Sequence, residues 1–206
     1  MTSISIIGSG KMGAAIAEVA ARAGSNIQII KRSAASASAA RPGFEYGVMG
    51  DDLTGDLVVL AVPYSAYPSI LELYRDQIGE RVVIDISNPI DFSTYDALKS
   101  PPDSSTAAEL ARQLPEGAAV VKAFNVNLGD TLVSGTNGTT TTTVLFAGDY
   151  ADAKEAVREL IEAAGMRAVD AGPLTRAREL EAMGFLQIIM AALGKTRYES
   201  GFTLLP

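Results

Sequence analysis

Short runs of apolar residues recur along the chain and alternate with longer segments whose apolar positions repeat every three or four residues. The runs occupy residues 3–7, 26–30, 44–48, 56–62, 82–86, 118–124, 139–147 and 166–170. Nearly continuous apolar runs are typical of strands buried on both faces of a parallel sheet. The segments between them, 14–23, 65–77, 107–114 and 151–164, have helical spacing. The pattern predicts an α/β fold, a Rossmann-type doubly wound and mostly parallel sheet.

Polar residues near the helix starts refine these boundaries. Thr106 and Glu109 have the spacing of a capping box, and Asp149 can cap the helix at 151–164. The small residues at 133–138 predict a flexible turn. The threonine run at 139–143 continues without a break into an apolar run, so we predict one strand there, near a sheet edge.

The last part of the chain predicts a long helix at 174–194 and a tail. We expect residues 1–206 to form a single domain of this fold in which 174–206 are a C-terminal helical extension. The helix carries more large apolar side chains than one sheet face needs: Leu180, Met183, Phe185, Leu186, Ile189, Met190 and Leu193. We therefore predict a homodimer that buries part of this helix.

The first strand leads directly into a glycine-rich turn. Gly8, Gly10 and Gly13 have G-x-G-x-x-G spacing between a strand and a helix, which is the dinucleotide-binding fingerprint. The first glycine permits a tight turn, the second lets the backbone approach a pyrophosphate, and the third lets the helix pack on the strand. Free N–H groups at the helix start then face the phosphates. A glycine turn without a ligand is the alternative, but the flanking strand and helix favour nucleotide binding.

The end of the second strand distinguishes the two nicotinamide cofactors. An NAD-binding fold usually has Asp or Glu here to hold the ribose 2′-hydroxyl. This chain has Lys31, Arg32 and Ser33 instead. A guanidinium can bind the oxygens of a 2′-phosphate in a forked, charge-assisted way, and Ser33 adds a hydroxyl donor. The pattern predicts NADP, the alternative being a solvated basic strand end.

Ligands of such sheets bind beyond the carboxyl ends of the strands. Three strand ends therefore provide candidate cofactor contacts: Val62, Pro63 and Tyr64; Asn88 and Pro89; and Asn125. By themselves, the residues of the Asn-Pro pair are equally consistent with a plain turn.

Composition excludes several classes of function. The net charge of −7 argues against a nucleic-acid partner or an anionic membrane surface. The chain has no cysteine and no histidine, so it has no disulfide, no thiolate nucleophile and no cysteine metal site, and it lacks the commonest general acid/base and the commonest zinc ligand. The chain starts on a strand without a basic and apolar leader, and no apolar run reaches the roughly 20 residues that span a bilayer. We expect a cytoplasmic protein.

These motifs together resemble the F420-dependent NADP oxidoreductase family. The resemblance extends to bacterial dinucleotide-binding oxidoreductases of this size and to the cytosolic reductase domain of six-transmembrane metalloreductases. It covers essentially the whole chain and is carried by residues 8–13, 31–33, 61–64, 85–89, 120–126, 170–174 and 177–183. The Asn-Pro and Lys-Ala-Phe-Asn blocks are its most specific parts.

The resemblance implies roles for individual residues. The pyrophosphate is held by the glycine turn, here Gly8, Ser9, Gly10, Lys11 and Met12, and the 2′-phosphate by Lys31, Arg32 and Ser33. The nicotinamide walls correspond to Val62, Pro63, Asn88, Pro89 and Asn125. The chain departs from the F420 enzymes in lacking their histidine in the stretch 124–126. It also lacks the membrane segments that give the metalloreductases their flavin and heme relay.

The implied function is an NADP(H)-dependent oxidoreductase that transfers hydride between the nicotinamide and a planar acceptor such as coenzyme F420 or a flavin. Such a site needs apolar and amide walls rather than a general base. We expect apolar surface from Tyr64, Phe124, Met183, Phe185 and Met190, although core packing is the commoner role of such residues. Two alternatives remain. One is a small carbonyl or imine reductase, with Tyr64, Lys122 or solvent as proton donor; the other is a non-catalytic NADP-binding sensor.

Overall fold

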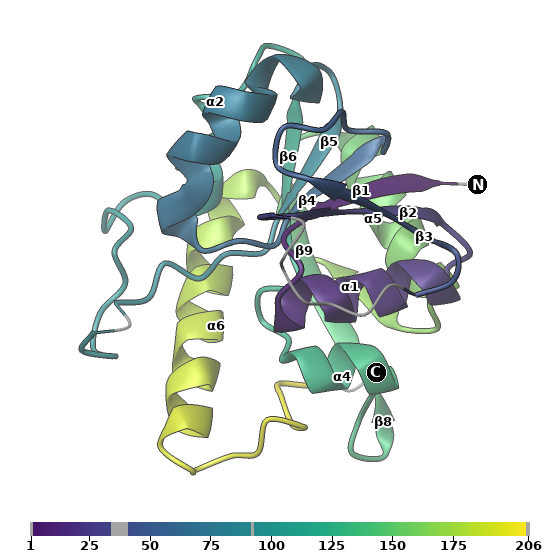
Figure 1. Cartoon of the computed structure of the whole chain (residues 1–206). Helices are drawn as coiled ribbons and strands as arrows, with labels where there is room; N and C mark the ends of the chain where they lie inside the picture. Colours follow the sequence, from purple (N-terminus) through teal and green to yellow (C-terminus); the bar gives the residue numbers. More distant parts are fainter. Residues whose placement is uncertain (1, 34–40, 92, 205–206) are drawn as a thin grey trace.

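A central sheet organises the molecule in the computed structural model, which describes residues 2–33, 41–91 and 93–204 (Figure 1). The sheet has the order β10-β9-β6-β5-β4-β1-β2-β3. Its strands are β1 (Ser3–Ile7), β2 (Asn26–Lys31), β3 (Phe44–Val48), β4 (Leu57–Leu60), β5 (Val82–Asp85), β6 (Ala119–Ala123), β9 (Thr143–Gly148) and β10 (Arg167–Asp170). Pairing is parallel except between β6 and β9. The predicted doubly wound, mostly parallel fold is confirmed.

Helices cover both faces of this sheet. They are α1 (Lys11–Arg22), α2 (Tyr67–Ile78), α3 (Thr106–Ala111), α4 (Gly129–Ser134), α5 (Ala151–Ala163) and α6 (Ala177–Ala192), with 3-10 turns at Tyr64–Ala66 and Leu174–Arg176. Successive strand residues serve opposite faces, because side chains alternate along a strand. Ile6 packs in the core cluster that contains α1 and α5, whereas Ile7 packs in the cluster that contains α2 and α3.

The segment 133–147 differs from its prediction. The expected turn at 133–138 instead contains the end of α4 and the strand β7 (Thr136–Asn137), which pairs with β8 (Thr140–Thr141) in a small hairpin. The expected single strand is split because buried Thr142 bonds to α4, its hydroxyl donating to the Thr131 carbonyl over 2.9 Å. The following strand, β9, lies near the sheet edge as predicted, next to the edge strand β10.

Both predicted helix caps are wrong in detail. Ser105, not Thr106, caps α3, and its Oγ accepts a hydrogen bond from the Ala108 N–H over 3.1 Å. Asp149 does not cap α5, which has no side-chain cap; instead its Oδ1 accepts from the Leu174 N–H over 2.8 Å. Asp149 thus fixes the chain just before the last helix.

The predicted long helix at 174–194 is present as the turn at Leu174–Arg176 followed by α6. α6 stands beside the carboxyl ends of the central strands, and the chain then turns back toward α4 (Figure 1). Asn137 Nδ2 holds this tail by donating to the Gly201 carbonyl over 2.6 Å. The last two residues of the predicted extension, 205 and 206, lie outside the described part of the chain.

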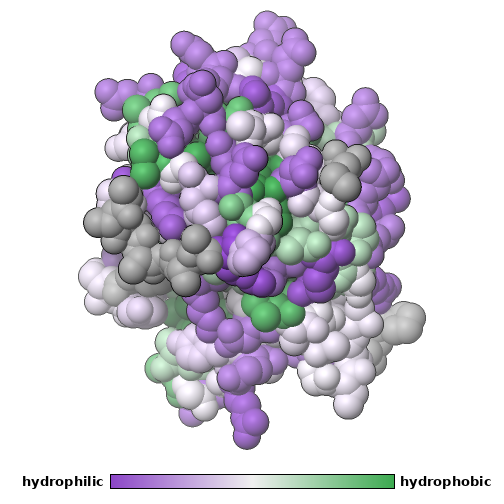
Figure 2. Space-filling model, turned by 45° about the vertical axis from the view of Figure 1, so that its right-hand side comes forward, coloured by the Kyte–Doolittle hydropathy of each residue, from purple (hydrophilic) through white to green (hydrophobic). Residues whose placement is uncertain are grey.

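The described surface is mixed in polarity. On the face shown in Figure 2, hydrophilic residues dominate and hydrophobic ones form small separate patches. Large apolar side chains of α6 are nevertheless exposed, with Leu186 at 52%, and so is Leu193 just after it at 67%. Among the described residues, no helix combines the length and apolar character that crossing a membrane requires.

Candidate functional site

Two glycines of the predicted fingerprint are required by the packing of the protein itself. Gly8 has a φ of +115°, and a Cβ there would lie 2.3 Å from the Ala61 carbonyl oxygen of the neighbouring strand end. A Cβ at Gly13 would lie 2.1 Å from the Gly8 carbonyl oxygen. Real atoms do not approach so closely, so these two glycines let β1, β4 and α1 meet.

Gly10 has no such role inside the protein. Its φ is −73°, which any residue adopts, and a Cβ there would meet no atom within 4 Å. It is also the N-cap of α1, and no side chain caps the free N–H groups of the first helical turn. Open space beside unsatisfied donors at the positive end of a helix fits a phosphate group. The residues present therefore fit the predicted pyrophosphate.

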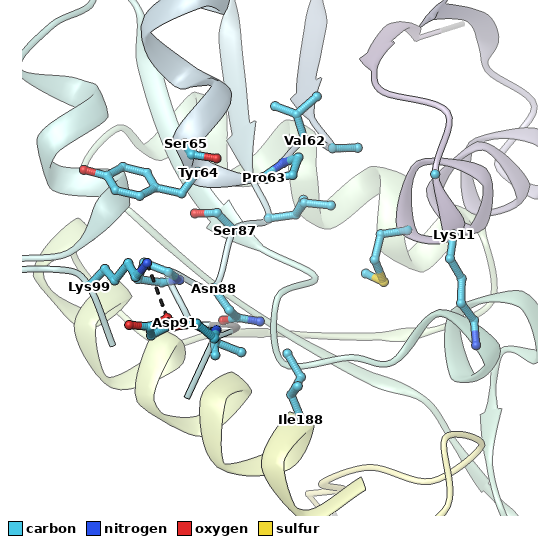
Figure 3. A pocket seen from close by; sticks show the side chains of 17 residues that line it. Lys11, Val62, Pro63, Tyr64, Ser65, Ser87, Asn88, Asp91, Lys99 and Ile188 are labelled. Carbon is cyan, nitrogen blue, oxygen red and sulfur yellow. Dashed lines mark hydrogen bonds and ion pairs between the residues drawn. The ribbon is translucent and has the colours of Figure 1, made fainter. Parts of the chain in front are cut away.

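A pocket of about 530 Å³ begins at this turn and extends past the ends of β4 and β5 (Figure 3). This volume lies within the range of small-molecule sites, about 300–1,000 Å³. The pocket brings together eight of the predicted cofactor residues: Gly10, Lys11, Met12, Val62, Pro63, Tyr64, Asn88 and Pro89. They come from three separate strand ends, as expected for the carboxyl edge of a parallel sheet.

Part of the pocket wall was not predicted. The segment after Pro89 folds over one side through a bridge between Ile90 and Leu98, and it adds Asp91 and Lys99, whose charged atoms are 3.5 Å apart. Helix α6 adds Ile188. The sequence of such a loop gives little indication of which residues pair. The spacing of Ile188 indicates only that it lies in a helix. Neither contact could therefore be predicted without the tertiary fold.

The predicted 2′-phosphate residues lie at the end of β2, outside this pocket. β2 pairs with β1, so they are at the same edge of the sheet as the glycine turn. Lys31 Nζ lies 4.2 Å from the ring centre of Tyr46, while Arg32 and Ser33 are exposed. Gly8 and Ser9, which are half-buried, also do not line the pocket.

Asn125 lies behind the pocket wall rather than in it. Its Nδ2 donates to Asn88 Oδ1 over 2.8 Å and to the Leu180 carbonyl over 2.9 Å, and Asn88 Nδ2 donates back to the Asn125 carbonyl. Both N–H bonds of the Asn125 amide are thus used within the protein. Helix α6 reaches this pair through Gly184, where a Cβ would lie 2.4 Å from Asn88 Oδ1.

Most of the aromatic and methionine residues expected at the site pack elsewhere. Of the five, Tyr64 lines the pocket and the other four do not. Phe124 is fully buried in the core, and Met183 packs with a small cluster around Leu180. For Phe124 and Met183 the core-packing alternative describes the structure better, whereas Phe185 and Met190 are half-buried.

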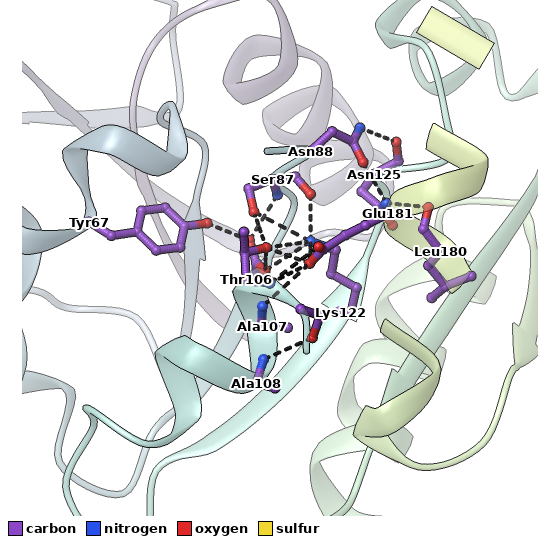
Figure 4. Close-up of polar contacts among 12 residues, drawn as sticks. Tyr67, Ser87, Asn88, Thr106, Ala107, Ala108, Lys122, Asn125, Leu180 and Glu181 are labelled. Atoms are coloured by element: carbon purple, nitrogen blue, oxygen red, sulfur yellow. Dashed lines mark hydrogen bonds and ion pairs between the residues drawn. The ribbon is translucent and has the colours of Figure 1, made fainter. Parts of the chain in front are cut away.

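A buried charged cluster lies directly behind the pocket, and the sequence analysis did not predict it (Figure 4). Lys122 is completely buried, and its Nζ lies 2.9 Å from Asp85 Oδ2 and 3.0 Å from Glu181 Oε1. Lys122 Nζ also donates to the Ser87 carbonyl over 2.5 Å. Ser87 is a pocket residue, so the cluster holds the strand end that forms the wall. Lys122 itself has no access to a ligand.

Two groups of the cluster, Asp85 and Tyr67, have shifted pKa values. Burial works to raise the pKa of Asp85, but the Lys122 ammonium and hydrogen bonds from Tyr67 and Ser87 outweigh it and hold the pKa below its ordinary value. Burial, together with the negative charge of Asp85, raises the pKa of Tyr67 well above its ordinary value. Tyr67 therefore stays protonated and donates to Asp85 Oδ1.

Comparison with known proteins agrees with this geometry. Residues 3–89 match the family model described as NADP oxidoreductase, coenzyme F420-dependent. The F420-dependent NADP reductase of Methanothermobacter thermautotrophicus is 35% identical over 133 residues, which are 62% of this chain and 57% of that protein. Metalloreductase STEAP3 of Rattus norvegicus is 33% identical over 128 residues, 62% of this chain and 25% of that protein. The match thus spans little more than half of one relative and a quarter of the other.

A solved structure extends the likeness to the whole fold. A protein of Arthrobacter sp. FB24, provisionally described as an F420-dependent NADP reductase, superimposes with a TM-score of 0.86. The alignment covers 100% of both chains at 24% sequence identity. At that identity the match establishes the shared fold.

Proposed function

We propose that the chain is a member of the F420-dependent NADP oxidoreductase family, whose model matches residues 3–89, and that it is an NADP(H)-dependent oxidoreductase. It exchanges a hydride between the nicotinamide and a planar acceptor, coenzyme F420 or a flavin. The observation that carries the proposal is the pocket that continues from the uncapped start of α1 to the ends of β4 and β5. When bound, NADP supplies the redox chemistry at its nicotinamide ring.

The protein contributes binding, orientation and exclusion of water. In this proposal Gly10, Lys11 and Met12 hold the pyrophosphate, and Arg32, with Lys31 and Ser33, holds the 2′-phosphate. The nicotinamide end is bounded by Val62, Pro63 and Asn88, with Ile188 of α6 opposite the strand ends (Figure 3). Exchange of a hydride between two stacked rings needs no general base, which suits a chain without histidine or cysteine.

The proposal includes a homodimer. It is supported by the exposed apolar side chains of α6 and the following tail, among them Leu186, Leu193 and Phe202. Contiguous exposed apolar surface on a helix commonly marks an interface. Ile188 of α6 lines the pocket, so a second subunit on this helix would lie close to the pocket wall.

The test is a direct assay. The purified protein is mixed with NADPH and, in separate reactions, with F420, FMN, FAD, small carbonyls and cyclic imines, and nicotinamide absorbance is followed. Oxidation of NADPH with F420 or a flavin is the expected result. Turnover with a carbonyl or imine alone would favour the reductase alternative, and tight NADPH binding without any turnover would favour the sensor.

A further inference from the structure

The hydroxyl group of Ser87 has one feature that the proposed function does not use. Ser87 lines the pocket between Tyr64 and Asn88 (Figure 3), and its side chain also belongs to the buried charged cluster (Figure 4). A serine hydroxyl in a pocket can ordinarily donate or accept a hydrogen bond, because its proton rotates to suit the partner. Here the cluster behind it determines where that proton points.

The donors and acceptors of this network can be assigned beginning with Glu181, whose carboxylate accepts hydrogen bonds. Its Oε1 is approached by Lys122 Nζ at 3.0 Å, the Thr106 N–H at 2.9 Å and the Thr106 hydroxyl at 2.5 Å. Three donors converge on this one oxygen, so it is the acceptor in each of these contacts. The Thr106 hydroxyl also lies 3.2 Å from Asp85 Oδ2, so its proton goes to a carboxylate, and Glu181 Oε1 is the nearer of the two acceptors.

The assignment for Thr106 also determines which partner donates in its contact with Ser87. Ser87 Oγ and Thr106 Oγ1 are 2.7 Å apart, and either geometry is open in isolation. Because the single proton of Thr106 is committed to Glu181, Thr106 Oγ1 accepts from Ser87. The three ammonium protons of Lys122 have nearer acceptors at 2.5, 2.9 and 3.0 Å, so its donation to Ser87 Oγ at 3.4 Å and to Thr106 Oγ1 at 3.3 Å is weak. An ammonium group cannot accept, so Lys122 does not take the Ser87 proton either. Ser87 thus offers lone pairs, and no proton, to a ligand.

Building on the proposed function, we propose that Ser87 Oγ accepts a hydrogen bond from the carboxamide N–H of the nicotinamide and thereby selects and orients the ring. At the end of β5, the pocket then recognises a ligand by its N–H donor. Thr106, which is fully buried, acts as a positioning residue because it alone keeps the Ser87 proton away from the pocket.

The experiment compares two ligands that differ at this one group. In 3-acetylpyridine adenine dinucleotide phosphate a methyl group replaces the carboxamide NH₂ of NADP⁺, and the carbonyl is kept. Calorimetry measures the dissociation constant of each ligand with the full chain. The wild type should bind NADP⁺ about fivefold to tenfold more tightly than the analogue, the ratio expected for one hydrogen bond. In Ser87→Ala this preference should disappear.

Two further sets of variants test the cluster. Ser65→Ala removes another hydroxyl that lines the pocket but is exposed, and it should keep the preference. Thr106→Val releases the Ser87 proton and should reduce or reverse the preference, whereas Thr106→Ser, which retains the hydroxyl, should restore it. A change in folding alone would affect both ligands equally, so the ratio separates recognition from stability.

The outcomes are distinguishable. If the wild type binds neither ligand, the proposed NADP function fails. If it binds both but does not prefer NADP⁺, or if Ser87→Ala keeps the full preference, NADP binding stands and the role of Ser87 is overturned. Loss of the preference in Ser87→Ala together with its loss in Thr106→Val, and not in Ser65→Ala or Thr106→Ser, supports the inference.

Discussion

A Cβ added at Gly13 would lie 2.1 Å from the Gly8 carbonyl oxygen, whereas one added at Gly10 would meet no protein atom within 4 Å. The two glycines belong to one sequence motif, but each position requires glycine for a different reason. Gly13 serves the packing of α1 on β1. Gly10 serves the space in front of the helix, which the proposed function fills with a pyrophosphate.

This difference predicts opposite behaviour of two substitutions. Gly13→Ala should lower the free energy of unfolding by about 1–3 kcal/mol, the usual cost of overpacking. Gly10→Ala should cost less than about 1 kcal/mol, the cost of a poorer N-cap residue, yet weaken NADP⁺ binding by at least about tenfold because its Cβ enters the phosphate space. Urea unfolding and calorimetry measure the two effects. Equal loss of stability in both variants would contradict this division of roles.

Arg32 is the residue on which the choice between NADP and NAD depends in our proposal. Arg32→Ala should weaken NADPH binding by about 1.5–3 kcal/mol, the value of a hydrogen bond to a charged group, and leave NADH binding nearly unchanged. Arg112→Ala is a suitable control, since Arg112 is an exposed arginine that pairs with Glu109 and does not line the pocket. Equal losses for the two cofactors in Arg32→Ala would remove the 2′-phosphate assignment.

At the scale of single elements, α6 packs against the residues behind the pocket wall at Gly184. Gly184 lets the helix backbone come close to the Asn88 and Asn125 pair, and a Cβ would lie 2.7 Å from the Asn125 carbonyl oxygen. The contact is specific to this face of the helix. Ala182, two residues earlier, is exposed.

Gly184→Ala should therefore displace α6 or Asn88. We expect a loss of about 1–3 kcal/mol in stability and weaker NADP⁺ binding, because Asn88 lines the pocket. Ala182→Val adds bulk to the exposed face and should cost only about 0.5 kcal/mol through helix propensity. Thermal unfolding and calorimetry make the comparison. If Gly184→Ala were no more damaging than Ala182→Val, the close approach would not be a functional contact.

The elements that were predicted correctly are those whose signal is local. The apolar strands and the helical stripe of α5 follow from burial on the sheet, and the glycine turn follows from its spacing. The split at Thr142 could not be predicted, because threonine has a high strand propensity. Its hydrogen-bond partner, the Thr131 carbonyl, lies in another element. The cap at Ser105 was misplaced by one residue because Thr106 is equally good as a cap but is occupied by Glu181.

At the scale of the whole molecule, the charged cluster shows what sequence patterns leave out. Lys122, Asp85 and Glu181 come from β6, β5 and α6, and each alone resembles an ordinary solvent-exposed residue or strand end. Only the fold brings them together behind the pocket. The cofactor residues were easier to predict, since parallel strands bring their carboxyl ends to one edge.

The cluster also makes stability depend on pH. The lowered pKa of Asp85 means that its stabilising contribution is present above the ordinary carboxyl pKa and is lost as pH falls below about 4. The raised pKa of Tyr67 means that stability is lost as pH rises above about 10, where the unfolded chain ionises first. Urea unfolding across this range should show both losses. Tyr67→Phe should reduce the alkaline loss more than Tyr198→Phe, which changes an exposed tyrosine; equal slopes would contradict the assignment.

The proposed dimer gives a prediction at the same scale. Leu186→Glu places a charge on the exposed face of α6 and should convert the protein to a monomer at micromolar concentration, because an unpaired charge in an interface is costly. Leu73→Glu is the matched control, since Leu73 is an exposed leucine on α2. Light scattering gives the mass of each. A wild-type monomer, or a dimer that survives Leu186→Glu, would exclude this interface.

The contact of Glu181 with Thr106 has a consequence for how the protein is made. The two residues are 75 positions apart, and Lys122 precedes Glu181 by 59. During synthesis on the ribosome, β1 to β6 emerge well before α6. Until α6 arrives, Lys122 has only Asp85 as its carboxylate partner, and Thr106 has no oxygen of Glu181 to accept its proton. A nascent chain can therefore assemble most of its sheet while the wall behind the pocket is still incomplete, and under the proposed function cofactor binding would follow the synthesis of α6.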